Sequence, residues 1–188
     1  AIAGGPAFAD LERRLLAILD SKERIPTVTR IGGRLYNFWR DAANPKGLWR
    51  RTTLEEYRRA EPAWEGVLDL DALAAAEHEN WVWHGATVLA PEDRRCLVAL
   101  SRGGADADVI REFDLDTKTF VENGFSLPEA KSQVAWRDPT SLFVASDFGP
   151  DSLTTSGYPR TVRIWTRGTP ATAADVIFEG RSDDMSVG

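Results

Sequence analysis

Two segments of the sequence decide the fold, Leu97-Val98-Ala99-Leu100-Ser101 and Leu142-Phe143-Val144-Ala145-Ser146, because they repeat one apolar pattern at an offset of 45 residues. The next strand-like run repeats as well, since residues 109–115 match residues 161–167 at an offset of 52. The seven additional residues fall in the loop 147–159, between strands rather than inside one. Short strands that recur every 40 to 50 residues or so are typical of β-propeller blades. The repeat therefore predicts a propeller, with a β-sandwich of fortuitous internal similarity as the alternative.

Alternating apolar residues place strands along most of the chain after the first 26 residues. The runs are residues 35–40, 48–52, 82–89, 96–101, 109–115, 134–136, 142–146 and 161–167. Residues 8–19 have apolar side chains at helical spacing and predict one amphipathic helix, which Pro26 separates from the strands. Residues 54–59 and 71–77 predict two short helices, the second with Asp71 as its N-cap. The predicted fold class is mainly β: an incomplete propeller of about three four-stranded blades, preceded by one amphipathic helix.

This pattern divides the chain into a helix with its linker, residues 1–26, and a partial propeller, residues 27–188. Closed propellers have about four to eight blades, so about three blades do not close a ring. Both ends look cut, and we expect a fragment of a longer protein. Each terminal blade would leave an apolar face in water, so we expect the isolated chain to self-associate.

Composition argues against several classes of partner. The chain has 188 residues, 43% of them hydrophobic, which is enough for one packed core. Asp and Glu number 29 against 23 Lys and Arg, and the net charge of -6 argues against nucleic acid or a membrane surface. No apolar run approaches the roughly 18 residues of a membrane-spanning helix. We expect a cytoplasmic protein, with secretion left open, and a buried, unreactive Cys96.

The residues do not predict catalytic chemistry within this chain. The segment Gly124-Phe125-Ser126-Leu127-Pro128 resembles a nucleophile elbow but ends in proline, which the tight strand-to-helix turn does not permit. Only His78 and His84 are available as a base, so we expect no Ser-His-Asp triad. Glu77, His78, Glu79 and His84 do not have the spacing of a metal site, and we expect no metal and no cofactor.

Three further groups of residues have simple structural interpretations. The arginines at 50, 51, 58 and 59 are offset by nearby glutamates, which predicts a solvated charged surface rather than a phosphate site. Asp114 and Asp116 are expected in a turn rather than at calcium. The tryptophans in strands predict packing between blades, with a ligand-stacking platform as the alternative. They are Trp39, Trp49, Trp81, Trp83, Trp136 and Trp165.

The early part of the predicted propeller has a recognisable order of motifs. They are Gly33-Arg34-Leu35-Tyr36-Asn37-Phe38-Trp39-Arg40-Asp41, then Gly47-Leu48-Trp49-Arg50-Arg51-Thr52, then Trp64-Glu65-Gly66-Val67-Leu68-Asp69-Leu70-Asp71-Ala72-Leu73. This order resembles the opening of the propeller of the prolyl oligopeptidase family of serine peptidases. The likeness continues through residues 90–93, 100–106, 134–136 and 156–160, so it covers most of the chain after the first helix.

The resemblance implies a parent enzyme with two domains. In this family a seven-bladed propeller caps a C-terminal α/β-hydrolase domain, which holds the Ser, Asp and His and hydrolyses short peptides, usually after proline. The propeller gates access by excluding large folded substrates. None of the triad positions lies in this chain, so the resemblance implies no catalytic residue here and predicts that the isolated chain is inactive.

The resemblance singles out Asp106 and Lys131 as residues of the substrate cavity or of the contact between the domains. The family's second blade has a Gly-Ser-Asp turn whose aspartate pairs with a substrate-binding arginine, and Gly104-Ala105-Asp106 resembles it with Ala105 in place of serine. The alternative for Asp106 is an ordinary loop carboxylate. Lys131 lies where typical members place an aromatic residue of the specificity pocket, a departure that bears on strict post-proline specificity.

The sequence thus favours the propeller part of a prolyl-oligopeptidase-like serine peptidase, with a peptide substrate and a hydrolase domain as partners. The rival function is a propeller used as a protein-interaction scaffold with no hydrolase attached. A third possibility is a sandwich-type binding module, which predicts a closed, monomeric core from these residues.

Overall fold

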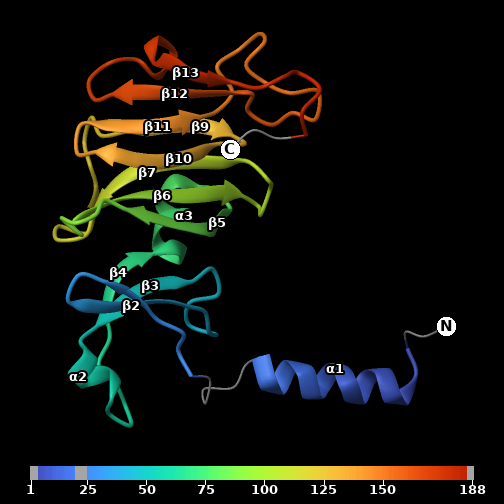
Figure 1. Cartoon of the computed structure of the whole chain (residues 1–188). Coiled ribbons are helices and arrows are strands. Elements are labelled where there is room, and N and C mark those ends of the chain that lie inside the picture. Colours follow the sequence, from blue (N-terminus) through green and yellow to red (C-terminus); the bar gives the residue numbers. More distant parts are fainter. Residues whose placement is uncertain (1–3, 20–24, 186–188) are drawn as a thin grey trace.

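Three antiparallel sheets stack face to face in chain order, as the computed structural model shows for residues 4–19 and 25–185 (Figure 1). Blade 1 consists of β1 (Thr29–Ile31), β2 (Arg34–Trp39), β3 (Leu48–Thr52) and β4 (Glu65–Asp69). Blade 2 consists of β5 (Trp81–Val88), β6 (Arg95–Arg102), β7 (Asp108–Asp114), β8 (Thr119–Phe120) and β9 (Ser126–Ala130). Blade 3 consists of β10 (Gln133–Asp138), β11 (Ser141–Ala145), β12 (Thr161–Thr166) and β13 (Asp175–Glu179). The predicted propeller of about three blades is confirmed.

Blade 2 contains five strands but, like the other blades, has only four strand positions across its sheet. Both β8 and β9 pair with the same neighbour, β7: β8 at residues 113–114 and β9 at residues 108–111. They are therefore two halves of one outer strand, interrupted at residues 121–125. Phe125 lies in this interruption and is 2% exposed, so the break turns an aromatic ring into the junction with blade 3.

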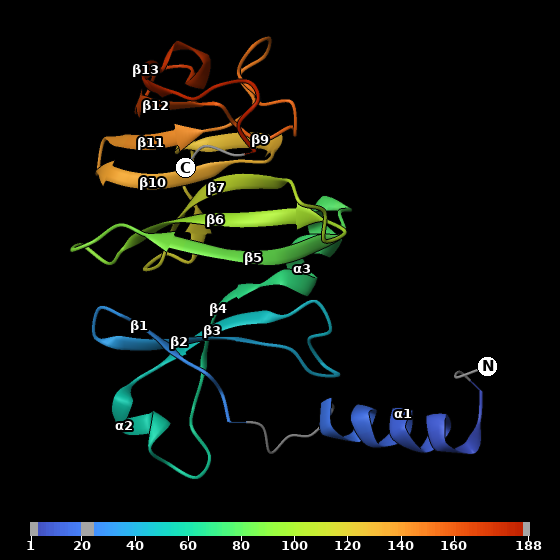
Figure 2. The same ribbon diagram turned by 45° about the vertical axis from the view of Figure 1, so that its right-hand side comes forward.

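Helices lie outside the sheets. The amphipathic helix α1 (Pro6–Leu19) confirms the sequence prediction and has no buried residue, while α2 (Leu54–Tyr57) follows β3. Helix α3 (Leu70–Glu77) connects blades 1 and 2, and a 3-10 turn, η1 (Ala171–Ala173), precedes β13. Figure 2 shows α1 standing apart from the stacked sheets. Within the described residues, no helix combines the length and apolarity needed to cross a membrane.

The predicted N-cap of α3 is wrong by two residues. Asp69, rather than Asp71, accepts a hydrogen bond from the backbone N–H of Ala72 at 2.9 Å. Asp71 instead accepts from the backbone N–H groups of Lys46 and Gly47, at 3.1 to 3.2 Å. The carboxylate of Asp71 thereby ties the β2–β3 loop to α3, a long-range contact that helix-start rules do not anticipate.

Aromatic rings fill the junctions between blades, as the tryptophan pattern predicts. Trp49 of blade 1 is 4% exposed and lies 4.9 Å from Trp83 of blade 2, centroid to centroid. At the next junction Phe125 of blade 2 contacts Trp165 of blade 3 at 4.8 Å, edge to face. Cys96 is fully buried, as expected, and burial raises the pKa of its thiol.

Candidate functional site

Asp106, Lys131 and Tyr158 form a polar cluster that joins blades 2 and 3. Asp106 lies in the β6–β7 loop, Lys131 in the β9–β10 connection and Tyr158 in the long β11–β12 loop. The Lys131 Nζ lies 3.0 Å from Asp106 Oδ2, and the Tyr158 hydroxyl donates to the same oxygen at 3.0 Å. The Lys131 ammonium also lies 4.0 Å from the centroid of the Tyr158 ring. The two residues singled out by the resemblance are therefore in direct contact. They follow β6 and β9, and β6 and β11 finish at the same end of the stack (Figure 2).

Charge and hydrogen bonding set the protonation of this cluster. The hydrogen bond from Lys131, and then that from Tyr158, holds the pKa of Asp106 below its usual value. The same contact with Asp106 raises the pKa of Lys131. Asp106 is therefore a carboxylate and Lys131 an ammonium at neutral pH, and their side chains keep 67% and 33% of their surface exposed. The pair presents both charges to any molecule that approaches this end.

A second polar chain lies beside the cluster and includes the histidine that sequence reasoning left without partners. His84 Nδ1 lies 2.7 Å from Asp108 Oδ1, and His84 Nε2 lies 3.1 Å from Ser101 Oγ. Burial raises the pKa of Asp108 against the opposing effect of His84. The structure thus brings a Ser, a His and an Asp together in the order of a hydrolytic triad, which the sequence did not predict.

These contacts do not form an active site, because Ser101 is buried. Ser101 is 0% exposed, because β6 lies between β5 and β7 and its side chain shares the sheet face of Leu97 and Ala99, which packs against blade 3. A peptide carbonyl cannot approach its Oγ, and a nucleophile must reach the carbonyl carbon. The hydrogen bond with His84 instead satisfies the buried hydroxyl of Ser101, as buried polar groups require, and the imidazole also lies beside the carboxylate of Asp108.

Other candidate residues have structural partners in the part of the chain that is described. Glu77 pairs with Arg111 at 2.7 Å, and Glu79 pairs with Arg102 at 2.9 Å. His78 is the left-handed C-cap of α3. No group of three or more His, Cys, Asp or Glu side chains among the described residues has the geometry to hold a metal. Ser126 begins β9, so its surroundings differ from the strand–turn–helix of a nucleophile elbow.

The interpretation of Arg51 as a solvated surface group is wrong. Arg51 is 8% exposed and donates to Glu65 at 2.7 and 3.0 Å, and its Nη1 donates to the carbonyl of Leu115 in blade 2 at 2.8 Å. Its hydrogen bonds lower the pKa of Glu65 to about 2. The sequence shows that glutamates lie near Arg51. It does not show that side-chain alternation along β3 directs Arg51 toward blade 2.

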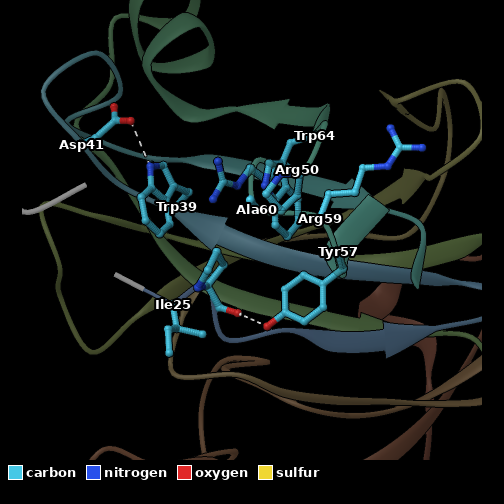
Figure 3. A pocket seen from close by; sticks show the side chains of 10 residues that line it. Ile25, Trp39, Asp41, Arg50, Tyr57, Arg59, Ala60 and Trp64 are labelled. Carbon is cyan, nitrogen blue, oxygen red and sulfur yellow. Dashed lines mark hydrogen bonds between the residues drawn. The ribbon is translucent and has the colours of Figure 1, made fainter. Parts of the chain in front are cut away.

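Arg50 points to the opposite face of blade 1 and lies between two indole rings. Its guanidinium carbon is 4.3 Å from the ring centroids of both Trp39 and Trp64. With Tyr57 and the Ile25–Pro26 segment these side chains line a cavity of about 650 Å³ (Figure 3). Trp39 therefore lies on the face of blade 1 that points away from blade 2, where packing against another blade stays a prediction.

Residues 5–188 match the model of the prolyl oligopeptidase N-terminal beta-propeller domain. The chain belongs to the prolyl oligopeptidase family. This membership agrees with the order of motifs in the sequence and with the three stacked blades.

Individual members of the family support the assignment. An uncharacterized peptidase, y4nA, of Sinorhizobium fredii is 42% identical over 183 residues, which cover 96% of this chain and 25% of that protein. A post-proline cleaving enzyme from Rickettsia typhi superposes with a TM-score of 0.88 at 30% identity, covering 96% of this chain and 27% of that one. A prolyl endopeptidase structure shares the fold, with a TM-score of 0.63 at 16% identity over 95% of this chain and 29% of that one.

The chain spans about a quarter of the length of these prolyl oligopeptidase relatives. Two residues of the polar cluster, Asp106 and Lys131, were found through the family resemblance, whereas Tyr158 was not assigned a role. Tyr158 lies within the segment 156–160 that carries part of the resemblance, but its contact spans 52 positions of sequence. Only the folding of the β11–β12 loop over blade 2 shows that it belongs to the site.

Proposed function

We propose that this chain is the N-terminal propeller part of a serine peptidase of the prolyl oligopeptidase family, which hydrolyses short peptides after proline. In this proposal residues 27–188 form the first blades, and a hydrolase domain outside this chain carries the nucleophile. The propeller limits access to the reaction, and Asp106 and Lys131 line the route to it. The relative from Rickettsia typhi, called a post-proline cleaving enzyme, supports the choice of reaction.

The cluster of Asp106, Lys131 and Tyr158 is the observation that carries the gating role. Its three side chains come from three separate loops, all at one end of blades 2 and 3. An exposed ion pair held by a third group presents charge in a fixed position at low cost, because its partners already satisfy one another. A peptide or a domain surface that meets this end therefore encounters an ordered carboxylate and ammonium.

The proposal is tested in the longer protein that contains this propeller, with a chromogenic Gly-Pro peptide. We expect Asp106→Asn and Lys131→Ala to lower kcat/KM about tenfold each, chiefly through KM, which is the change expected when binding rather than chemistry is lost. Glu92→Gln is the matched control, because Glu92 is an exposed carboxylate in the β5–β6 hairpin at the opposite end of blade 2.

Two results would overturn the proposal. An unchanged kcat/KM in both the Asp106 and the Lys131 variants would show that these residues do not line the route to the active site. A longer protein that lacks any peptidase activity would favour a scaffold role for the propeller instead. Thermal unfolding of each variant is measured alongside, since the exposure of Asp106 predicts an unaltered fold.

A further inference from the structure

A β-bulge in β5 places His84 against side chains of the two neighbouring strands. The register of β5 with β6 shifts between Trp83 and Gly85, so His84 is the additional residue of the bulge. Gly85 permits this bulge, because its φ of +129° lies in the region that favours glycine. The imidazole of His84 therefore lies between Ser101 Oγ, at 3.1 Å, and Asp108 Oδ1, at 2.7 Å.

Asp108 has a carboxylate oxygen without a hydrogen-bond donor. Its Oδ1 is buried and accepts no hydrogen bond from the described residues, although His84 Nδ1 lies 2.7 Å away. Burial has the largest effect on the pKa of Asp108 and raises it, whereas the charge of His84 lowers it. A buried carboxylate oxygen without a donor destabilises the fold, and a positive charge beside it reduces that cost. Protonation of His84 supplies such a charge.

Asp106 and Lys131 are the other charged residues close to this contact. The hydrogen bonds from Lys131 and Tyr158 lower the pKa of Asp106 most, and the charge of His84 lowers it further. The other charged groups of α3, β6, β7 and β10 have partners of their own or lie at the far end of their strand. They are Asp71 with the β2–β3 loop, Glu77 with Arg111, Glu79 and Glu129 with Arg102, Arg95 with Glu112, Arg94 with Asp114, and Arg137 and Asp138 at the end of β10.

The position of the β6–β7 loop depends on its two ends. At the first end the backbone N–H of Gly103 donates to the carbonyl of Asn80 at 2.8 Å. At the second end Asp108 begins β7, and its side chain meets His84. A change in the charge of His84 therefore acts on the end of the loop that lies next to Asp106.

We propose that His84 is a proton-sensitive positioning residue: as an imidazolium it compensates the carboxylate of Asp108 and fixes the loop that carries Asp106, and as a neutral imidazole it holds this loop less firmly. A histidine side chain gains or loses its proton between about pH 5 and 8. The loop is therefore held most firmly at the acidic end of this range and loosens as the pH rises. The effect on peptide binding at Asp106 rests on the proposed function, whereas the switch itself does not.

Hydrogen–deuterium exchange, followed by mass spectrometry in the longer protein, provides the test. We expect the protection of residues 103–108, corrected for the intrinsic pH dependence of exchange, to fall about fivefold from about pH 5.5 to about pH 8, an effect typical of a partly exposed ion pair. His84→Asn and Asp108→Asn should each abolish this pH dependence, because neither variant can form the pair of opposite charges. His78→Asn is the matched control, since His78 is the other histidine of the chain and its left-handed conformation suits asparagine.

Protection that depends on pH in the longer protein and in His78→Asn, but in neither of the other two variants, supports the switch. Protection that does not vary with pH contradicts it, as does a pH dependence that survives in His84→Asn or in Asp108→Asn. Circular dichroism verifies the fold of each variant, and Asp108→Asn provides the comparison if His84→Asn does not fold. Turnover of a chromogenic Gly-Pro peptide by the same samples tests the proposed function separately, because a lack of turnover leaves the exchange result unaffected.

Discussion

At the scale of single residues, Glu112 is a fully buried carboxylate that joins blades 2 and 3. Its side chain is completely buried, and Arg167 of blade 3 donates to its two oxygens at 2.8 and 2.9 Å. The backbone N–H of Phe125 donates to Glu112 Oε2 at 2.9 Å. The charge is thus paired and its acceptor oxygens are satisfied, as a buried ion requires.

Removal of this charge should destabilise the protein strongly. We expect Glu112→Gln to lower the free energy of unfolding by about 3 kcal/mol, because Arg167 then loses its counter-ion at a buried junction. Urea denaturation measures the change. Glu129→Gln is the control, since Glu129 pairs with Arg102 at an exposed site and should cost less than about 1 kcal/mol. Equal effects of the two substitutions would contradict the role of Glu112.

Glu65 predicts how stability depends on pH. Arg51 lowers the pKa of Glu65 from 4.5 to about 2 in the folded protein. A lowered pKa in the folded state means that the ionised carboxylate stabilises the fold above pH 4.5, and that this contribution is lost as the pH falls from 4.5 toward 2. Unfolding followed across this window should show the loss in the parent chain and a flatter profile in Glu65→Gln. A profile unchanged by Glu65→Gln would contradict the assignment.

At the scale of elements, the β2–β3 loop depends on Gly47. Its φ of +123° lies in the region that favours glycine, and an added Cβ would lie 2.2 Å from the Phe38 ring. Phe38 stacks on Trp83 of blade 2, 5.1 Å between centroids, so the ring cannot move away freely.

We therefore expect Gly47→Ala to lower the free energy of unfolding by about 2 kcal/mol or more. Gly33→Ala, in the β1–β2 hairpin, should change it little, because an added Cβ there meets nothing within 4 Å and the residue needs no positive φ. Thermal melts of the two variants provide the comparison. A harmless Gly47→Ala would mean that the loop and Phe38 rearrange together.

Periodicity predicted the elements that combine alternation with several apolar residues, such as β6 and β11, and it predicted α1. It missed β1, β8 and β9, which are short or interrupted, because their pairing with a neighbouring strand rather than their own pattern defines them. It also missed β4 and β13. All five residues of β13 are exposed, so this strand has no buried side from which a pattern would arise.

At the scale of the whole molecule, the sequence predicted the stack of blades and two members of the polar cluster, the latter through the resemblance. It did not predict Tyr158, the contacts of Ser101 with His84 and Asp108, or the direction of Arg51 toward blade 2. Each of these depends on contacts between residues from separate strands or loops. Strand direction and register determine those contacts, and the spacing of residues along the sequence predicts neither of them.

We propose that these blades shape access to a reaction whose nucleophile lies outside this chain. The most direct measurement is the turnover of a chromogenic Gly-Pro peptide by the purified 188-residue chain, with a serine-directed reagent as the control and Ser101→Ala as the matched variant. We expect no turnover above background for both chains, because Ser101 is fully buried. Turnover that the reagent abolishes, and that Ser101→Ala lacks, would contradict it.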